Sequence, residues 1–380
     1  LALHDVGHTL GLNQNFKGSY LHNVNDVHNT EITSKLGVTA SVMEYPAINL
    51  APLGIEQGDY FDVAPGPYDI WAIKYGYTPD LTVEQLDNII SEQNKHEHMF
   101  ANDSEDMRSP GRGIDPRAMI YDLTSDPITY ATQRIELIKD AQENIVSKLS
   151  GNIETFEEFR LAHSIFIREH ARSLEVISRH IGGVYVERFD PKNSITKKPY
   201  SPTPSEEQRR AMESLNKFAF APEAFPINSE LLEMVQVERR MFELYGEHED
   251  PQMHKIILGI QNRVLDHVLS AWTLARISDT ELYGNDYSVY EVMDDLTESI
   301  FTGDSNNEVN SIRRNLQTAF VRRLIDILAQ SYYDEFATAA AYNSLRKIEK
   351  IVKKSSNHLP TKSHRKLISW IIESGLDRAN

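Results

Sequence analysis

Apolar side chains that recur every three to four positions dominate the chain from about residue 129 onward, and they constrain the fold more than any other feature. Ile135, Ile138 and Ile145 belong to one such stripe, and Leu316 and Phe320 to another. This spacing is typical of helices with one buried face. It predicts helices over residues 129–149, 153–181, 205–219, 228–244, 252–276, 287–301, 306–331, 333–353 and 362–375.

The pattern predicts a mainly α fold with little sheet. The β-branched and aromatic run 182–187 predicts one short extended segment, and the four prolines of residues 189–204 indicate a break between two helical subdomains. Before residue 80, Pro67 to Tyr75 predicts a helix that Gly76 ends, after a long loop over residues 12–40. Residues 82–93 predict another helix. The three tryptophans are expected in the core: Trp71, Trp272 and Trp370.

Charge and cysteine content exclude several classes of partner and site. The formal net charge of −17 argues against nucleic acid and anionic membranes, because both need a basic face. The chain has no cysteine, which excludes disulfides and cysteine-ligated metal. No apolar run approaches the 18 residues of a membrane span, so no transmembrane segment is expected.

Two histidines near the start, His4 and His8, carry the clearest chemical signal. At this spacing a helix places both imidazoles on one face, where they can bind one metal ion. Asp5 follows the first histidine, and Gly11 can end the helix. A histidine pair alone is weak evidence, because a chain with 14 histidines often contains one by chance.

The surrounding motifs resemble the metzincin zinc proteases, which combine H-E-x-x-H-x-x-G-x-x-H with a methionine turn. More closely, they resemble the bacterial Met-zincins, which are large extracytoplasmic proteins whose helix reads H-E-V-G-H-T-L-G-L-x-H-N-F. The matching stretches are His4-Asp-Val-Gly-His-Thr-Leu-Gly-Leu-Asn-Gln-Asn-Phe16, Ser41-Val-Met-Glu-Tyr-Pro46 and Gly66-Pro-Tyr-Asp-Ile-Trp-Ala-Ile-Lys-Tyr-Gly76.

The resemblance implies a zinc cofactor and assigns roles by position. His4 and His8 match the first two zinc ligands, and Gln14 stands at the position of the third. Met43 matches the methionine turn. Tyr45 matches a tyrosine that assists the oxyanion in some metzincins.

Two positions depart from the family pattern. Asp5 replaces the glutamate that acts as the base, and its carboxylate stands about 1 Å farther from the zinc-bound water, a misplacement that can lower the rate about 10²-fold. Gln14 offers a neutral oxygen, which zinc binds poorly. His22 or His28 in the following loop could supply a ligand instead.

We therefore expect a metzincin-like half-site in residues 1–80 and a helical region over residues 81–380. The implied function is zinc-dependent peptide hydrolysis outside the cytoplasm, with a peptide or protein substrate. The position of the motif suggests that more of the same protein precedes Leu1 and holds most of the sheet of the site.

Two alternatives remain open at this point. The first is a pseudoprotease that binds a peptide or protein partner without cutting it. The second is an HD-type metal phosphohydrolase, whose adjacent His and Asp would explain Asp5. It would need an aspartate from a later helix, such as Asp140 or Asp294, and leaves the motifs around Met43 and Gly66 unexplained.

Overall fold

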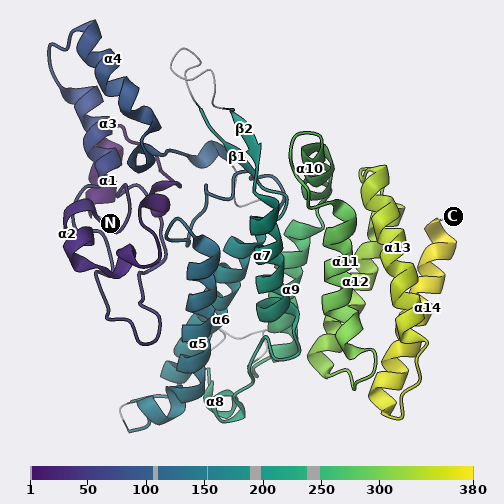
Figure 1. The fold of residues 1–380 in the computed structure, drawn as a ribbon. Helices are drawn as coiled ribbons and strands as arrows, with labels where there is room; N and C mark the ends of the chain where they lie inside the picture. The colour runs from purple at the N-terminus through teal and green to yellow at the C-terminus, as the bar shows by residue number, and fades with distance from the viewer. Residues whose placement is uncertain (1, 106–109, 152, 189–197, 238–248, 380) are drawn as a thin grey trace. The chain divides into compact units, whose positions relative to one another are not determined.

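The computed structural model describes residues 2–105, 110–151, 153–188, 198–237 and 249–379 (Figure 1). The contacts divide the chain into two compact units. Unit 1 comprises residues 1–137 and 183–201, and unit 2 comprises residues 138–182 and 202–380. Residues 81–137 therefore lie in the same compact unit as the first 80 residues. The expected boundary of the metzincin-like half-site at residue 80 stays a prediction.

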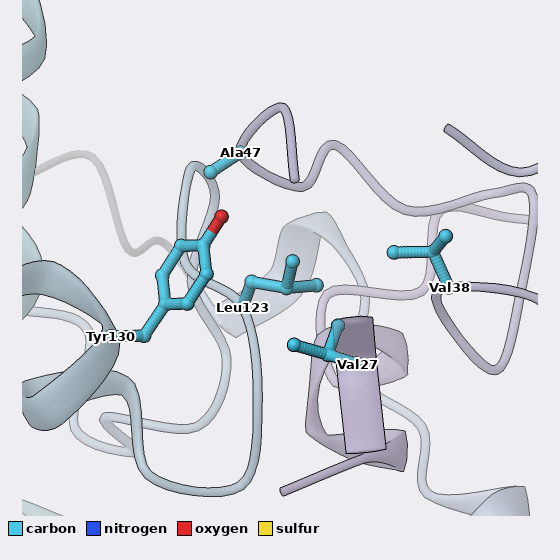
Figure 2. Packing of buried hydrophobic residues seen from close by; sticks show 5 residues of the cluster. All are labelled: Val27, Val38, Ala47, Leu123 and Tyr130. Atoms are coloured by element: carbon cyan, nitrogen blue, oxygen red, sulfur yellow. The ribbon is translucent and has the colours of Figure 1, made fainter. Parts of the chain in front are cut away.

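Unit 1 consists of short helices joined by long ordered connections. A core of five buried side chains joins the loop after the first helix to the segment before residue 131, as Figure 2 shows: Val27, Val38, Ala47, Leu123 and Tyr130. The helices are α1 (Ala2–Thr9), α2 (Thr30–Leu36), α3 (Pro67–Tyr77) and α4 (Val83–Ser91), with single 3₁₀ turns at Gly18–Leu21, Asp26–His28, Glu92–Asn94, His96–His98 and Asp103–Glu105.

Two features of unit 1 differ from the sequence-based expectations. Residues 12–40 are not one long loop, because Asn29 caps α2 by accepting a hydrogen bond from the amide of Glu31. The predicted extended segment is β1 (Val184–Val186), and it pairs with β2 (Tyr200–Pro202), which the proline-rich sequence did not indicate.

Unit 2 is helical, and its helices pack side by side. Within it, α12 contacts α9, α13 and α14, as the green and yellow helices of Figure 1 illustrate. Its elements are α5 (Pro127–Leu149, which begins in unit 1), α6 (Glu157–Ser178), α7 (Ser205–Leu215), a π turn (Asn216–Phe220), α8 (Ser229–Met234), α9 (Met253–Val268), α10 (Ala271–Glu281), α11 (Val289–Phe301), a 3₁₀ turn (Thr302–Asp304), α12 (Ser311–Ala329), α13 (Glu335–Val352) and α14 (Leu359–Ala379).

The mainly α class predicted from periodicity is confirmed, with local corrections. The helix expected over residues 252–276 is two helices, because the Ser270 hydroxyl accepts a hydrogen bond from the Thr273 amide and starts α10. The helix expected over 228–244 ends at Met234, and residues 238–244 lie outside the described part. Trp272 and Trp370 are not core residues, since 64% and 61% of their surfaces are exposed.

Among the described residues, no helix combines the length and apolar composition that crossing a bilayer requires.

Candidate metal site

Helix α1 presents the two histidines together. Their ring centroids are 4.8 Å apart and their planes are nearly perpendicular, at 84°. The Nδ1 atom of His4 donates to the carbonyl oxygen of Val42 at 2.7 Å, and that of His8 donates to the carbonyl oxygen of Leu12 at 3.0 Å. A carbonyl only accepts, so each neutral ring carries its proton on Nδ1 and keeps a lone pair on Nε2, the arrangement of metal-binding histidines.

The segment around Met43, which the family pattern predicts to be a methionine turn, lies against the same helix. Met43 is fully buried, and its sulfur would be only 2.3 Å from a Cβ atom built on Gly7, which lies between the two histidines in α1. A side chain at position 7 would force the buried end of the Met43 side chain to shift. The Met43 carbonyl also accepts a hydrogen bond from the Asn15 amide at 3.0 Å, which ties the turn to the loop after α1.

The first turn of α3 holds the methionine turn in place. Asp69 accepts hydrogen bonds from the Ser41 hydroxyl at 2.5 Å and from the amides of Val42 and Gly66, both at 2.9 Å. A Cβ atom at Gly66 would lie 2.1 Å from the Ala40 carbonyl oxygen, so only glycine fits there. Sequence reasoning identified this segment only as a family motif and assigned Asp69 no role. The available signal was the Gly66-Pro67-x-Asp69 start of a helix, with proline at the first position and aspartate at the third.

Gln14 and Tyr45 complete the group around the histidines. The Gln14 amide nitrogen lies 3.3 Å from Nε2 of His8 and donates to the Tyr45 hydroxyl at 3.3 Å. The Tyr45 ring lies 4.9 Å from the His4 ring. The structure therefore brings together four of the predicted site residues, together with Met43. Asp5 is exposed on α1 and has no side-chain partner among the described residues.

These residues fit a metal ion at two positions. His4 is 7% exposed, and its Nε2 atom has no hydrogen-bond partner within the described part of the chain. A bound cation would coordinate this buried lone pair. No group of three or more His, Asp or Glu side chains suited to a metal occurs in that part. His22 instead donates from Nε2 to the Gly37 carbonyl, and His28 joins no such group. The side chain that lies beside His8 at the third position of the family motif is the Gln14 amide.

A buried pair of carboxyl groups lies behind Tyr45, and sequence reasoning missed it. Glu44 accepts hydrogen bonds from the amides of Tyr45 at 2.8 Å and Ser19 at 3.2 Å, while Asp122 accepts one from the Ser19 hydroxyl at 2.8 Å. Burial, reinforced by the negative charge of Asp122, raises the pKa of Glu44 well above its usual range. Burial also raises the pKa of Asp122 to about 7.

An apolar cavity of about 540 Å³ opens beside the histidines, within unit 1. Its edge near the site is formed by His4 and Tyr45. Its walls are mainly apolar and include Val38, Ala47, Ile48, Tyr60, Phe61 and Tyr121. Such a cavity can take an apolar side chain of a bound peptide.

Paired histidines on one helix, beside a buried methionine, indicate a metallopeptidase-like fold. The chain belongs to the Met-zincin family, whose model matches residues 1–308. The match covers unit 1 and extends through α11, while α12, α13 and α14 follow it. No curated protein and no solved structure matches the chain.

Membership in this family removes the main support for the phosphohydrolase alternative. That alternative also needed an aspartate to join His4 and Asp5, and the described residues contain no such cluster. One of its candidates, Asp294, accepts a hydrogen bond from Lys347 at 2.5 Å.

Proposed function

We propose that this chain carries the metal site of a zinc-dependent peptidase, in which His4 and His8 hold the ion through Nε2. The observation that carries the proposal is the pair of bonds from Nδ1 of each histidine to the carbonyl oxygens of Val42 and Leu12. These bonds fix the ring orientation and leave both Nε2 atoms as ligands. A bound zinc ion would supply Lewis acidity and an activated water.

The remaining residues have distinct roles in peptide hydrolysis. The Tyr45 hydroxyl, which lies beside the histidines, donates a hydrogen bond to the carbonyl oxygen of the scissile peptide as charge develops on it. The Asp5 carboxylate accepts a proton from the attacking water. Its shorter side chain predicts a rate about 10²-fold below that of a glutamate at the same position. The cavity beside Tyr45 favours a substrate with an apolar side chain next to the cleaved bond.

A second candidate is a pseudoprotease that binds peptide in the same frame without cutting it. Gln14 favours it, because a neutral amide stands where the family pattern has a third histidine. An extracytoplasmic location is part of both proposals and derives from the family resemblance. Cell fractionation of the source organism would test it.

Metal analysis and a paired rescue separate the two candidates. Protein purified without added metal should carry about one equivalent of zinc, and His8→Ala should lose it. Peptide hydrolysis should rise about 10²-fold in the Asp5→Glu, Gln14→His double variant. The matched control is Asp87→Glu, an exposed aspartate on α4, which should change nothing. Zinc binding without hydrolysis, in both the unaltered protein and the double variant, would favour the pseudoprotease.

A further inference from the structure

The side-chain amide of Gln14 lies between two polar atoms of the metal site. Its nitrogen is 3.3 Å from Nε2 of His8 and 3.3 Å from the hydroxyl of Tyr45. Because His8 keeps its proton on Nδ1, bonded to the Leu12 carbonyl, its Nε2 atom needs a donor. Of the two ends of the Gln14 amide, only the nitrogen can donate, so the tautomer of His8 determines which end faces it.

This orientation presents hydrogen-bond donors, and donors cannot bind a cation. Both N–H bonds of the amide are used, one toward His8 and one toward Tyr45. The amide oxygen has no partner among the described residues, so the nitrogen alone holds the side chain in this position. The amide at the third position of the family motif therefore occupies the His8 lone pair and competes with a metal ion for it.

We propose that Gln14 is a latch that competes with zinc for His8, so that zinc binds only when the amide nitrogen leaves Nε2. The proposal rests on the metal-holding part of the proposed function and not on catalysis. His4 stays available to zinc, because its Nε2 atom is buried and has no hydrogen-bond partner within the described residues. The latch thus weakens zinc binding without abolishing it, and Tyr45 shares in it by accepting the second N–H bond.

Zinc affinity tests the latch directly, because the two possible roles of Gln14 predict opposite changes. If the amide competes with zinc, Gln14→Ala should bind zinc about tenfold more tightly, the effect of removing competing hydrogen bonds of ordinary strength. If the amide oxygen is a ligand, the same variant should bind zinc more weakly. The measurement is a titration of the full chain with zinc against a chromophoric chelator at fixed pH.

Two further variants keep the test sharp. Asn13→Ala removes an exposed amide from the same loop and should leave the zinc affinity unchanged. Gln14→Leu keeps the size of the side chain without its donors, and should tighten zinc binding even if the alanine variant unfolds. In the unaltered protein, the ¹⁵N–¹H signals of the Gln14 amide should shift when zinc is added.

Weaker or unchanged zinc binding in the Gln14 variants would overturn the latch, and so would the absence of zinc binding in every protein tested. Tighter binding together with no peptide hydrolysis would support the latch and reject only the proposed peptidase activity.

Discussion

The sulfur of Met43 lies where a side chain at Gly7 would have to be, 2.3 Å from the position of its Cβ atom. The methionine turn therefore packs directly against the backbone of α1, between the two histidines. This contact packs the segment around Met43 against the helix that carries both histidines.

Gly7→Ala should lower the free energy of unfolding by about 1–3 kcal/mol, the usual effect of forcing extra atoms into a packed core. Thermal melting measures the change. The control is Gly76→Ala on α3, where nothing lies within 4 Å of the new Cβ atom. That substitution should be neutral or slightly stabilising, as expected in a helix. Equal melting temperatures for both variants would show that Met43 does not press on α1.

Asp69→Asn should destabilise unit 1 by about 1–3 kcal/mol. The carboxylate accepts hydrogen bonds at both oxygens, whereas the NH₂ group of asparagine would point an N–H bond at one of the groups that now donate to Asp69. The donors are the Ser41 hydroxyl and the amides of Val42 and Gly66. Since Val42 also holds His4, zinc affinity should fall as well. Melting and chelator competition measure the two effects, with the exposed Asp87→Asn as the control. Loss of stability with unchanged zinc affinity would separate the turn from the metal site.

Asp122→Asn should stabilise the protein, relative to the unaltered chain, more strongly at pH 8 than at pH 5. Burial raises the pKa of Asp122 from its ordinary value of 3.8 to about 7. A carboxyl whose pKa is raised on folding favours the folded state while protonated, and this stability is lost as the pH rises from about 4 through 7. Asparagine stays neutral and can still accept the hydrogen bond from Ser19.

The difference in melting temperature between this variant and the unaltered protein should grow between pH 5 and pH 8. Asp103→Asn, an exposed change in the same unit, should show no such dependence. A constant difference over that range would contradict a buried, protonated Asp122.

Lys17→Met should destabilise the protein by about 1–3 kcal/mol, because it removes one of the two cations paired with buried Asp115 and leaves the Val186 carbonyl without its donor. The Lys17 ammonium lies 2.7 Å from Asp115 and donates to the Val186 carbonyl, and both side chains of the pair are nearly inaccessible. Denaturant unfolding measures the loss. Lys95→Met, which breaks an exposed pair with Glu92, should change stability by less than about 1 kcal/mol. Similar effects of the two variants would mean that burial adds nothing to the Lys17 pair.

Much of the helical architecture follows from local sequence alone. The apolar stripe around Ile135 and the one around Leu316 each lie within a single helix, so short-range spacing predicts them. The same holds for His4 and His8, which one turn of α1 brings together. The exposed tryptophans show the limit of this reasoning, because Trp272 and Trp370 are apolar without lying on a buried face.

Only the tertiary structure determined which residues far apart in the sequence contact one another around the histidines. Gln14 reaches Tyr45 across 31 positions, Ser41 reaches Asp69 across 28, and Ser19 reaches Asp122 across 103. No local pattern encodes these contacts, since they depend on the path of long connections between short helices. The sequence alone predicted a metal site with a pair of histidines and with Gln14 at the position of the third ligand. The folded chain brings the Gln14 amide within hydrogen-bonding distance of His8 and Tyr45, because the loop after α1 and the segment around Met43 run side by side.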